Sequence, residues 1–269
     1  MNFTKMHGCG NDFVLIDNIS EKIKEVDFPA IAKNLCDRKK GIGADGIIFM
    51  DIDSTCDIKM NFYNSDGSRG EMCGNGVRCL ARFAYHVLNL PKLNILTDAG
   101  IVKTERIDET KYKILLNNPS IEDYNCSINY KGVNYTGSYI ELGEPGIPHF
   151  CLEFDFENTN IDELYKFAEF LRHNSKFPKG ANINFFKLTG QNNVDELTYE
   201  RGVEDFTLSC GTGTGCVAVS LFKNKLINSN TLNAKTPGGD LTIELEFKSN
   251  NIKNIYLIGE TEIVFHGNY

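Results

Sequence analysis

One short motif occurs twice in this chain and constrains the fold more than any other feature. Residues 73–79 read Cys-Gly-Asn-Gly-Val-Arg-Cys and residues 210–216 read Cys-Gly-Thr-Gly-Thr-Gly-Cys, so both copies follow the pattern C-G-x-G-x-x-C. The second copy starts 137 residues after the first, about half of the length of 269 residues. Each copy is followed by apolar residues at helical spacing, which predicts a helix that begins at the motif.

The same offset relates other parts of the chain. The matched segments are Gly43-Ala44-Asp45 with Gly180-Ala181-Asn182, residues 47–49 with 184–186, Phe62-Tyr63 with Tyr199-Glu200, and Phe13 with Phe150. With two inserted residues, Thr97 and Gly100 match Thr236 and Gly239. Self-similarity at one period indicates a repeated architecture. Because the period is domain-sized, we predict two pseudo-symmetric lobes that face each other, residues 1–118 and 119–259, each presenting one cysteine.

Alternating and helical patterns predict a mixed α/β fold, in which each lobe is a mixed sheet with two helices. Strands are expected at residues 2–5, 13–17, 47–51, 58–63, 94–97, 101–105, 111–116, 137–142, 149–154, 183–188, 194–200, 241–247, 255–258 and 263–265. Buried helix positions are expected at Phe28, Ile31, Ala32, Leu35, Cys36, Val77, Leu80, Ala81, Ala84, Val87, Leu88, Ile161, Leu164, Tyr165, Ala168, Leu171, Val217, Leu221 and Leu226. Residues 117–120, which read Asn-Asn-Pro-Ser, mark the expected boundary between the lobes.

Composition excludes several classes of protein. The net charge of −8, without a basic run, argues against a nucleic-acid partner. No apolar run approaches the length of a membrane span, and the start of the chain lacks the order of a signal peptide, so we expect a cytoplasmic protein. The nine cysteines are odd in number, which disfavours a disulfide scaffold. The chain contains no C-x-x-C pattern, so no zinc site or other metal site is expected.

A cysteine at a helix start is suited to chemistry. The unpaired N–H groups and the positive dipole end stabilise an anion, which predicts a lowered thiol pKa at Cys73 and Cys210. The following glycines leave backbone N–H groups accessible to a substrate carboxylate. A buried structural cysteine is the alternative for either motif alone, and we assign that role to Cys79 and Cys216. A phosphate cradle is a further alternative, but the motifs lack the lysine of a P-loop.

Two such cysteines in related lobes suit inversion of a stereocentre. A thiolate removes the proton from one face of a carbon and a thiol protonates the other face, so the roles exchange with the direction of reaction. The α-proton of an amino acid is weakly acidic. Its removal without a cofactor requires fixed donors in a site that excludes water.

The chain resembles the diaminopimelate epimerases along nearly its whole length. The motifs that carry the resemblance are Met6-His7-Gly8 with Gly10-Asn11-Asp12-Phe13, Gly41-x-Gly43-x-Asp45, Asn64-x-Asp66-Gly67-Ser68, both cysteine motifs, Pro148-His149, Ala181-Asn182-Ile183, Tyr199-Glu200-Arg201-Gly202 and Pro237-Gly238-Gly239. The resemblance implies a cofactor-independent isomerase of the lysine and peptidoglycan precursor pathway. It also implies a sheet or barrel around a central helix in each lobe, an active site in the cleft between the lobes, a C-terminal strand at about 260–269 that joins the first lobe, and a homodimer.

The resemblance also assigns roles to individual residues. It implies that Cys73 and Cys210 are the catalytic bases and that His149 and Glu200 adjust their protonation. The residues expected to bind the substrate are Asn11, Asn64, Gly74, Asn75, Asn182, Glu200, Arg201, Gly211 and Thr212. Ordinary alternatives are a turn cap for Asn64, a buried imidazole for His149, and a surface pair for Glu200 and Arg201.

The chain departs from the family pattern at three positions. Ile147 stands where the family usually has asparagine, Gly46 where many relatives have glutamine, and Phe206 where many close relatives have an acid. These changes affect recognition of the distal end of the substrate. We therefore predict epimerisation of LL-diaminopimelate to the meso isomer, with racemisation of another amino acid such as histidine as the alternative. A non-catalytic anion-binding or thiol-redox protein is the third alternative.

Overall fold

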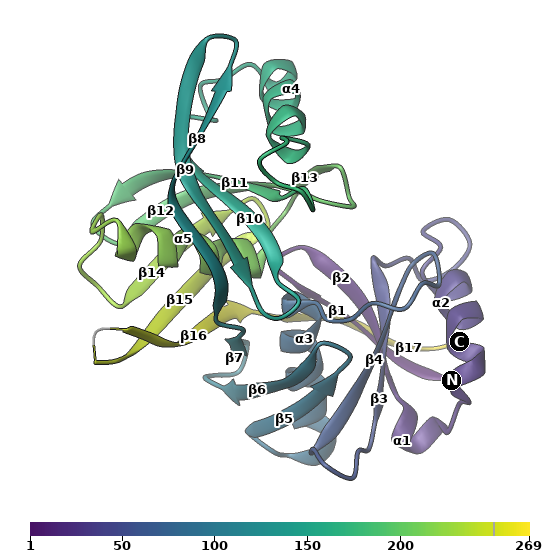
Figure 1. The fold of residues 1–269 in the computed structure, drawn as a ribbon. Helices are drawn as coiled ribbons and strands as arrows, with labels where there is room; N and C mark the ends of the chain where they lie inside the picture. The colour runs from purple at the N-terminus through teal and green to yellow at the C-terminus, as the bar shows by residue number, and fades with distance from the viewer. Residues whose placement is uncertain (250) are drawn as a thin grey trace. The chain divides into compact units, whose positions relative to one another are not determined.

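Strands dominate the computed structural model, which describes residues 1–249 and 251–269 (Figure 1). The chain divides into two units, one of residues 1–115 with 258–269 and the other of residues 116–257. Each unit contains a mixed sheet and its own helices. The structure therefore confirms the predicted mixed α/β class with two related units.

Unit 1 is built on a ladder of eight strands, β17–β1–β2–β3–β4–β5–β6–β7. The pairs β2–β3 and β4–β5 are parallel, and the other pairs are antiparallel. Its strands are β1 (Asn2–Gly8), β2 (Asn11–Asp17), β3 (Gly46–Asp51), β4 (Ile58–Asn64), β5 (Lys92–Thr97), β6 (Gly100–Arg106), β7 (Lys111–Leu116) and β17 (Glu262–Asn268). Its helical segments are α1 (Asn18–Glu21), η1 (Glu25–Asp27), α2 (Phe28–Leu35) and α3 (Gly74–Leu88).

Unit 2 begins with a long hairpin and continues with the same kind of ladder. Its strands are β8 (Pro119–Tyr130), β9 (Val133–Leu142), β10 (Ile147–Glu153), β11 (Asn182–Gly190), β12 (Asn193–Glu200), β13 (Asp205–Thr207), β14 (Thr231–Thr236) and β15 (Gly239–Lys248), and β16 (Asn251–Glu260) follows. Its helices are α4 (Ile161–Arg172) and α5 (Gly211–Lys223). The pairs β10–β11 and β12–β14 are parallel.

The two units repeat one order of elements. In unit 1, the successive pairs from β1–β2 to β5–β6 are antiparallel, parallel, antiparallel, parallel and antiparallel. In unit 2, the pairs β9–β10, β10–β11, β11–β12, β12–β14 and β14–β15 follow the same order, and β13 has no counterpart in it. The repeat extends to individual hydrogen bonds. The Thr97 hydroxyl donates to the Gly100 carbonyl at 2.7 Å, and the Thr236 hydroxyl donates to the Gly239 carbonyl at 2.6 Å. The repeat found in the sequence therefore relates residues at equivalent positions in the two units.

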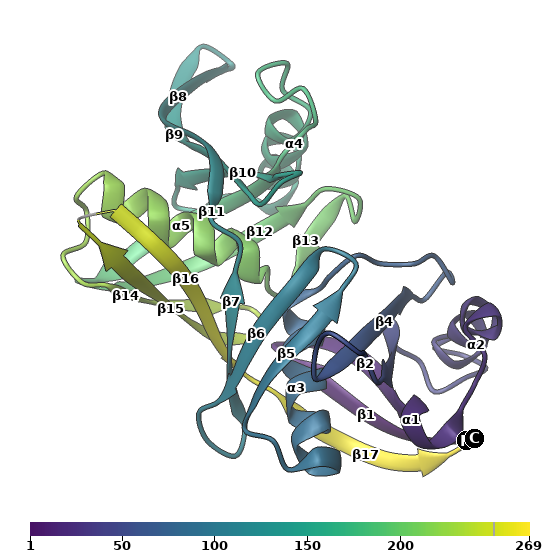
Figure 2. The same cartoon turned by 60° about the horizontal axis from the view of Figure 1, so that its bottom comes forward.

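One helix in each unit is enclosed by the strands of that unit. Helix α3 contacts β1, β2, β3 and β6 (Figure 2), and helix α5 contacts β9, β10, β11, β14 and β15. The core of α5 reads Cys-Val-Ala-Val-Ser-Leu from residue 216 to 221, and all six residues are buried. A helix that is apolar on all sides must be covered on all sides. Helices α2 and α4 instead pack on β3 with β4 and on β11 with β12.

Several sequence-based expectations were wrong. Strands β8, β13 and β14 were not expected. The side chains of Val87, Ile161, Tyr165 and Leu226 are exposed, because Val87 lies at the last turn of its helix, Ile161 at the first, Tyr165 at the edge of the buried stripe and Leu226 beyond the end of α5. Phe167 and Ala168 fill the core of unit 2 beside Leu164 and Leu171.

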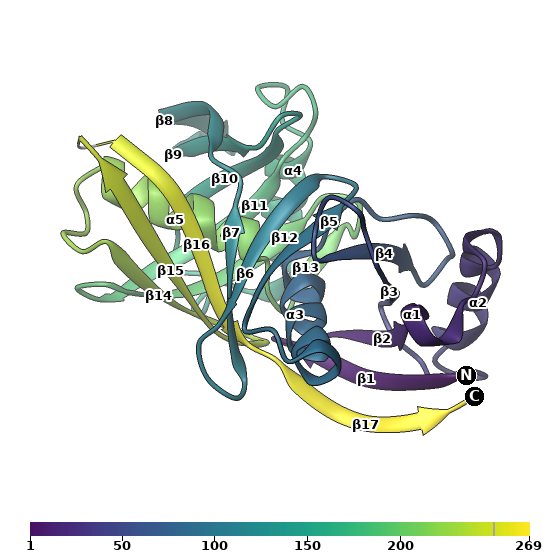
Figure 3. The same ribbon diagram turned by 90° about the horizontal axis from the view of Figure 1, so that it is seen from below.

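The two termini meet in unit 1 (Figure 3). Strand β17 pairs with β1 along its length, and the Met1 amino group donates to the Tyr269 carbonyl at 2.9 Å. The C-terminal strand is thus part of the sheet that carries the first cysteine helix. Among the described residues, no helix is long and apolar enough to cross a membrane.

We predict that Gly213→Ala disrupts unit 2. A Cβ at this position would lie 2.0 Å from Oδ1 of Asn184, a fully buried side chain that has no room to move. Overpacking of this kind costs roughly 1–3 kcal/mol. Urea unfolding measures the loss, and Gly190→Ala is the matched control, because its Cβ would meet only the Asn193 amide at 3.0 Å, on an exposed side chain. Equal stability of the two variants would contradict the prediction.

Candidate functional site

In unit 1, Cys73 occupies the N-cap position of α3 in an extended conformation, and the helix begins at Gly74. The first N–H groups of a helix have no partner within it, so they face the region beside the sulfur. The Cys73 sulfur donates to Oδ1 of Asn11 at 3.3 Å. Asn11 begins β2 directly after the turn from β1, which places a polar amide next to the start of a helix that lies far away in sequence.

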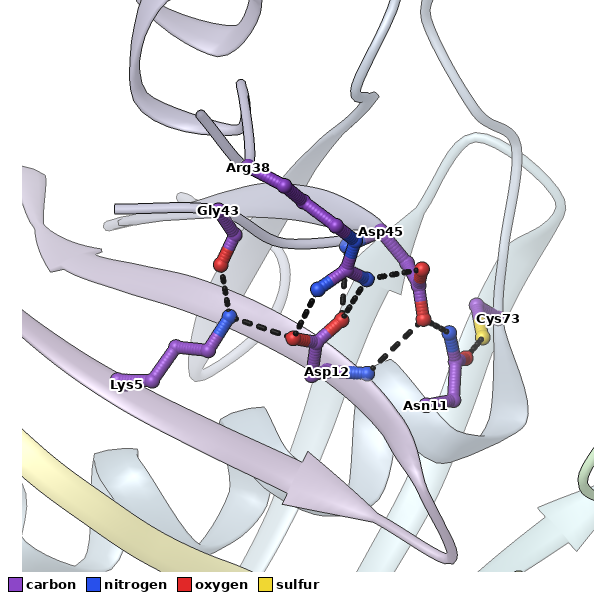
Figure 4. Close-up of polar contacts among 7 residues, drawn as sticks. All are labelled: Lys5, Asn11, Asp12, Arg38, Gly43, Asp45 and Cys73. Atoms are coloured by element: carbon purple, nitrogen blue, oxygen red, sulfur yellow. Dashed lines mark hydrogen bonds and ion pairs between the residues drawn. The ribbon is translucent and has the colours of Figure 1, made fainter. Parts of the chain in front are cut away.

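An ionic cluster supports Asn11 (Figure 4). The Asn11 Nδ2 group donates to Oδ2 of Asp45 at 2.7 Å. Arg38 bridges Asp45 at 2.7 Å and Asp12 at 2.8 Å, and Lys5 donates to Asp12 at 2.7 Å. Burial would raise the pKa of Asp12, but the bonds from Arg38 and Lys5 outweigh it and hold that pKa well below its usual range. The cluster is therefore charged at neutral pH.

The next turns of α3 contain a buried cation. The Arg78 side chain is fully buried, and its NH2 group donates to Oδ1 of Asn75 at 2.7 Å. Asn75 is buried as well. Of the other predicted residues of unit 1, Asn64 ends β4 and donates to the Ser68 hydroxyl at 2.9 Å, which makes it a turn cap in this structure. Unit 1 thus brings together Cys73, Asn11 and the Gly74–Asn75 helix start.

In unit 2, Cys210 is the N-cap residue of α5. Its sulfur lies 3.5 Å from the Thr212 hydroxyl. Burial raises the pKa of the Cys210 thiol well above its ordinary value, and the Glu200 carboxylate adds to this, while Thr212 and the Gly213 N–H oppose it. The expectation of a lowered pKa was therefore wrong for Cys210, because desolvation and a nearby negative charge outweigh the helix start.

Glu200 lies at the end of β12, and its carboxylate accepts from the Thr207 hydroxyl at 2.6 Å. Burial raises the pKa of Glu200, and hydrogen bonds from Thr207 and the Cys210 thiol act in the opposite sense. Thr207 belongs to β13, the short strand that the sequence did not reveal. The pairing of β12 with β13 thus fixes the carboxyl group that adjoins the second cysteine.

A neutral network lies behind the second cysteine motif. The His149 side chain is fully buried, and its Nδ1 atom accepts from the Asn184 amide at 3.1 Å. The Asn184 oxygen accepts from the Thr198 hydroxyl at 3.1 Å. Burial lowers the pKa of His149 to about 3, so the imidazole is neutral at physiological pH. Asn184 and Thr198 were not identified from the sequence, although both are polar residues inside predicted strands.

Asn182 and Arg201 lie next to each other in unit 2. The Asn182 oxygen accepts from the backbone N–H of Arg201 at 2.8 Å, and the Arg201 side chain donates to the Lys179 carbonyl at 3.0 Å. Asn182 pairs with His149 across β10 and β11. The Arg201 side chain is exposed, so its guanidinium retains donors that can bind an anion.

The three departures from the family pattern have different local settings. A Cβ at Gly46 would lie 2.6 Å from the Phe62 ring and 2.7 Å from the Tyr63 carbonyl, so no larger residue fits there. Phe206 is partly buried, packs against Tyr165 with 4.8 Å between ring centroids, and lies against the unit 2 core. Ile147 begins β10 and is partly exposed. Packing accounts for Gly46 and Phe206, and only Ile147 is left as a possible specificity position.

Neither unit shows an arrangement for a metal. Across residues 1–249 and 251–269, no group of three or more His, Cys, Asp or Glu side chains is suited to hold an ion. Cys79 and Cys216 are fully buried, and burial raises the pKa of both thiols. Their environments match the structural role assigned to them.

Glu196 is the feature that the sequence analysis missed. It lies on β12 with 2% of its surface exposed, and neither carboxyl oxygen has a hydrogen-bond partner among the described residues. Burial raises the pKa of Glu196 to about 8, and its charge would raise the pKa of Cys210. Every second residue of this part of β12 is buried, namely Val194, Glu196 and Thr198. An acidic residue at a position that the alternation predicts to be buried was the sequence signal that could have identified Glu196.

We predict that Glu196→Gln changes how stability depends on pH. The folded-state pKa of about 8 lies above the ordinary value of 4.5, so the folded protein holds a proton that the unfolded chain releases between these values. Wild-type stability should therefore fall by about 1 kcal/mol per pH unit from this group between pH 5 and 8. Urea unfolding at several pH values should show a smaller slope for Glu196→Gln. The exposed Glu153→Gln variant should keep the wild-type slope; identical slopes in all three proteins would refute the prediction.

Structural comparison places the fold among known proteins. A phenazine biosynthesis protein of the PhzF family from Bacillus anthracis aligns with a TM-score of 0.74 and 14% identity over 99% of this chain and 98% of the other. A hydroxyproline epimerase from Agrobacterium vitis aligns with a TM-score of 0.71 and 13% identity over 99% and 91%. At these identities the likeness establishes the fold.

Sequence comparison establishes the family. The family model for diaminopimelate epimerase matches residues 3–121 and 144–264. Diaminopimelate epimerase from Aquifex aeolicus is 37% identical over 99% of this chain and 97% of its own, and that from Campylobacter jejuni serotype O:2 is 35% identical over 100% and 99%. As its paired cysteine motifs predict, the chain belongs to the diaminopimelate epimerase family.

Proposed function

We propose that this chain interconverts LL- and meso-diaminopimelate without a cofactor, with Cys73 and Cys210 as the two acid/base groups. One observation carries the proposal: the equivalent position of both repeats, the N-cap of the enclosed helix, holds a cysteine. Membership of the diaminopimelate epimerase family supports the substrate. The chain is thus an isomerase, in agreement with the names of its relatives.

The proposed reaction needs no change of oxidation state. One cysteine, as thiolate, takes the α-proton, so that the C–H bond breaks and an S–H bond forms. The other cysteine, as thiol, gives its proton to the opposite face of the same carbon, and its S–H bond breaks as the new C–H bond forms. The reverse direction exchanges the two roles, which is the use of a pair of like groups.

Backbone donors at both helix starts suit the α-carboxylate. Negative charge accumulates on that carboxylate as the proton leaves, and fixed N–H groups in a low-dielectric site stabilise it. The candidate donors are Gly74 and Asn75 on α3 and Gly211 and Thr212 on α5. Because each pair begins a helix, the dipole at each of the two helix starts favours an anion.

The remaining candidates suit the distal amino and carboxyl groups of the substrate. Arg201 offers guanidinium donors to a carboxylate, and Asn11, Asn64 and Asn182 offer both donors and acceptors. We propose that Glu200 controls Cys210 by its charge. His149 acts as a neutral group in this scheme, because burial lowers its pKa to about 3 and it holds no proton to donate as an acid near pH 7.

A second candidate substrate is another amino acid. Ile147 favours it, since an apolar side chain stands where an amide would contact the distal end of the substrate. The chemistry would be the same at the α-carbon.

The first experiment follows the reaction in deuterium oxide. Purified protein with reduced thiols is incubated with LL-diaminopimelate, and chromatography with mass spectrometry follows both isomers. We expect meso product with one solvent deuterium at the inverted carbon. If neither inversion nor exchange occurs, the substrate proposal is wrong, and the same assay on a panel of amino acids then tests the alternative.

The second experiment removes each cysteine. Cys73→Ala and Cys210→Ala should each lower the epimerisation rate by roughly 100-fold or more, because general acid–base groups contribute on that scale. Cys56→Ala is the matched control, since Cys56 is a partly exposed cysteine outside both motifs. Wild-type turnover by either helix-start variant would rule out the two-base mechanism.

Location and assembly are proposals. We propose a homodimer, which is what the resemblance implies for this chain, and a cytoplasmic location, which is what the sequence pattern led us to expect. Light scattering coupled to size-exclusion chromatography measures the mass of the assembly against the 30.2 kDa of one chain.

A further inference from the structure

The Asn11 amide connects an ion-paired carboxylate to the sulfur of Cys73 (Figure 4). Its nitrogen donates to Oδ2 of Asp45 at 2.7 Å, and its oxygen lies 3.3 Å from the sulfur of Cys73. The chemistry of its neighbour determines which end of the amide faces Asp45. A carboxylate only accepts hydrogen bonds, so Asp45 can face only the NH2 end of the amide.

The orientation of the amide determines what the sulfur can do. With its nitrogen held by Asp45, Asn11 presents only an acceptor to Cys73. An acceptor binds an S–H group and repels a thiolate. The contact therefore favours the protonated form of Cys73, the form that delivers a proton to the substrate carbon in one direction of the reaction.

Asp45 itself is fixed from three directions. Its Oδ1 atom accepts from Arg38 at 2.7 Å, and its Oδ2 atom accepts from the Asp12 N–H at 3.1 Å. Its own N–H donates to Oδ1 of Asp12 at 2.9 Å. Arg38 also holds Asp12 through two bonds of 2.8 and 3.0 Å. The carboxylate is thus locked in place by bonds that do not involve Asn11.

We propose that Asp45 is a positioning residue for the epimerase reaction, which fixes the Asn11 amide with its oxygen toward Cys73 and so favours the protonated form, in which Cys73 acts as the acid in one direction of the reaction. This inference rests on the proposed function for its role in turnover. The contact between Asp45, Asn11 and Cys73 is independent of the identity of the substrate.

Other ionisable groups lie on the elements around Cys73, and none of these residues is substituted in the test. They are Lys5, His7, Cys9, Asp12, Arg38, Glu71, Arg78 and Cys79. Arg38 keeps its bonds to Asp12 when Asp45 is replaced, so the cluster retains an ion pair.

The test measures the pH dependence of thiol alkylation without substrate. Wild type, Asp45→Ala and Asp45→Leu, which both lack an acceptor at this position, are treated with iodoacetamide across a range of pH, and mass spectrometry quantifies the peptides of Cys73 and Cys210 separately. Removal of Asp45 frees the amide to turn its NH2 group toward the sulfur, which favours the thiolate. We expect the Cys73 midpoint to fall by about half a pH unit to one pH unit, and the Cys210 midpoint to stay unchanged.

Two controls separate positioning from a general structural effect. Asp45→Glu keeps the carboxylate and should restore most of the wild-type midpoint. Asp98→Ala removes a carboxylate from another arginine pair of unit 1, the one with Arg69, and should leave Cys73 unaffected. In an Asn11→Ala background, Asp45→Ala should cause no further shift, because the effect passes through the amide.

Three outcomes would overturn the proposal. They are an unchanged Cys73 midpoint in both folded Asp45 variants, an equal shift at Cys210, or a shift that persists in the Asn11→Ala background. Initial rates of epimerisation in each direction, measured over the same pH range, report the role in turnover. Loss of the labelling shift contradicts the positioning role, whereas absence of epimerisation in the wild type contradicts the proposed function alone.

Discussion

The burial of one helix inside the sheet of each unit is the constraint on which the rest of the structure depends. Helices α3 and α5 make their contacts with strands of their own units, and their middle turns are buried. Apart from buried side chains such as Arg78 of α3, which donates to Asn75, the polar groups that lack a partner within such a helix are the backbone groups at its ends. The cysteine, the glycines and the first N–H groups are concentrated at the N-terminus for this reason, and close packing excludes a side chain at Gly213.

The structure favours the thiol form at both candidate bases, by different means. At Cys73 the amide oxygen of Asn11 accepts the S–H proton. At Cys210 burial and the Glu200 carboxylate raise the pKa. A two-base reaction needs one thiolate and one thiol at the same time. In the proposed reaction, the cysteine that acts as the base must therefore lose its proton before it can take the α-proton.

Much of the fold was predictable because the structural repeat is also a repeat of the sequence. Matching Phe13 with Phe150 places two fully or nearly fully buried residues on equivalent strands. Periodicity located α3 and α5 from their glycines onward. It did not reveal β8, which is mostly exposed and lacks clear alternation, or β13, which has only three residues. Short and exposed strands depend on their partners, and the sequence contains little local signal for them.

The sequence proposes candidate site residues such as Cys73 and Glu200, but it does not predict their charge states. The raised pKa of Cys210 could not be predicted, because it depends on how deeply the sulfur is buried and on the carboxylate beside it. Glu196 illustrates the same limit, since only the structure shows that both of its oxygens are buried without a hydrogen-bond partner among the described residues.

The two units place similar backbones in different chemical surroundings. At the offset of the repeat, Asp12 corresponds to His149 and Asp45 corresponds to Asn182. In unit 1 these positions form an ionic cluster with Arg38, whereas in unit 2 they are neutral, with the pKa of His149 lowered to about 3. The backbone gives each cysteine the same place at a helix start, but the charges around the two sulfurs differ. Equivalent geometry therefore does not give the two cysteines equivalent surroundings. In the proposed inversion, each direction would draw on both sets of supporting residues, with the roles of the two cysteines exchanged.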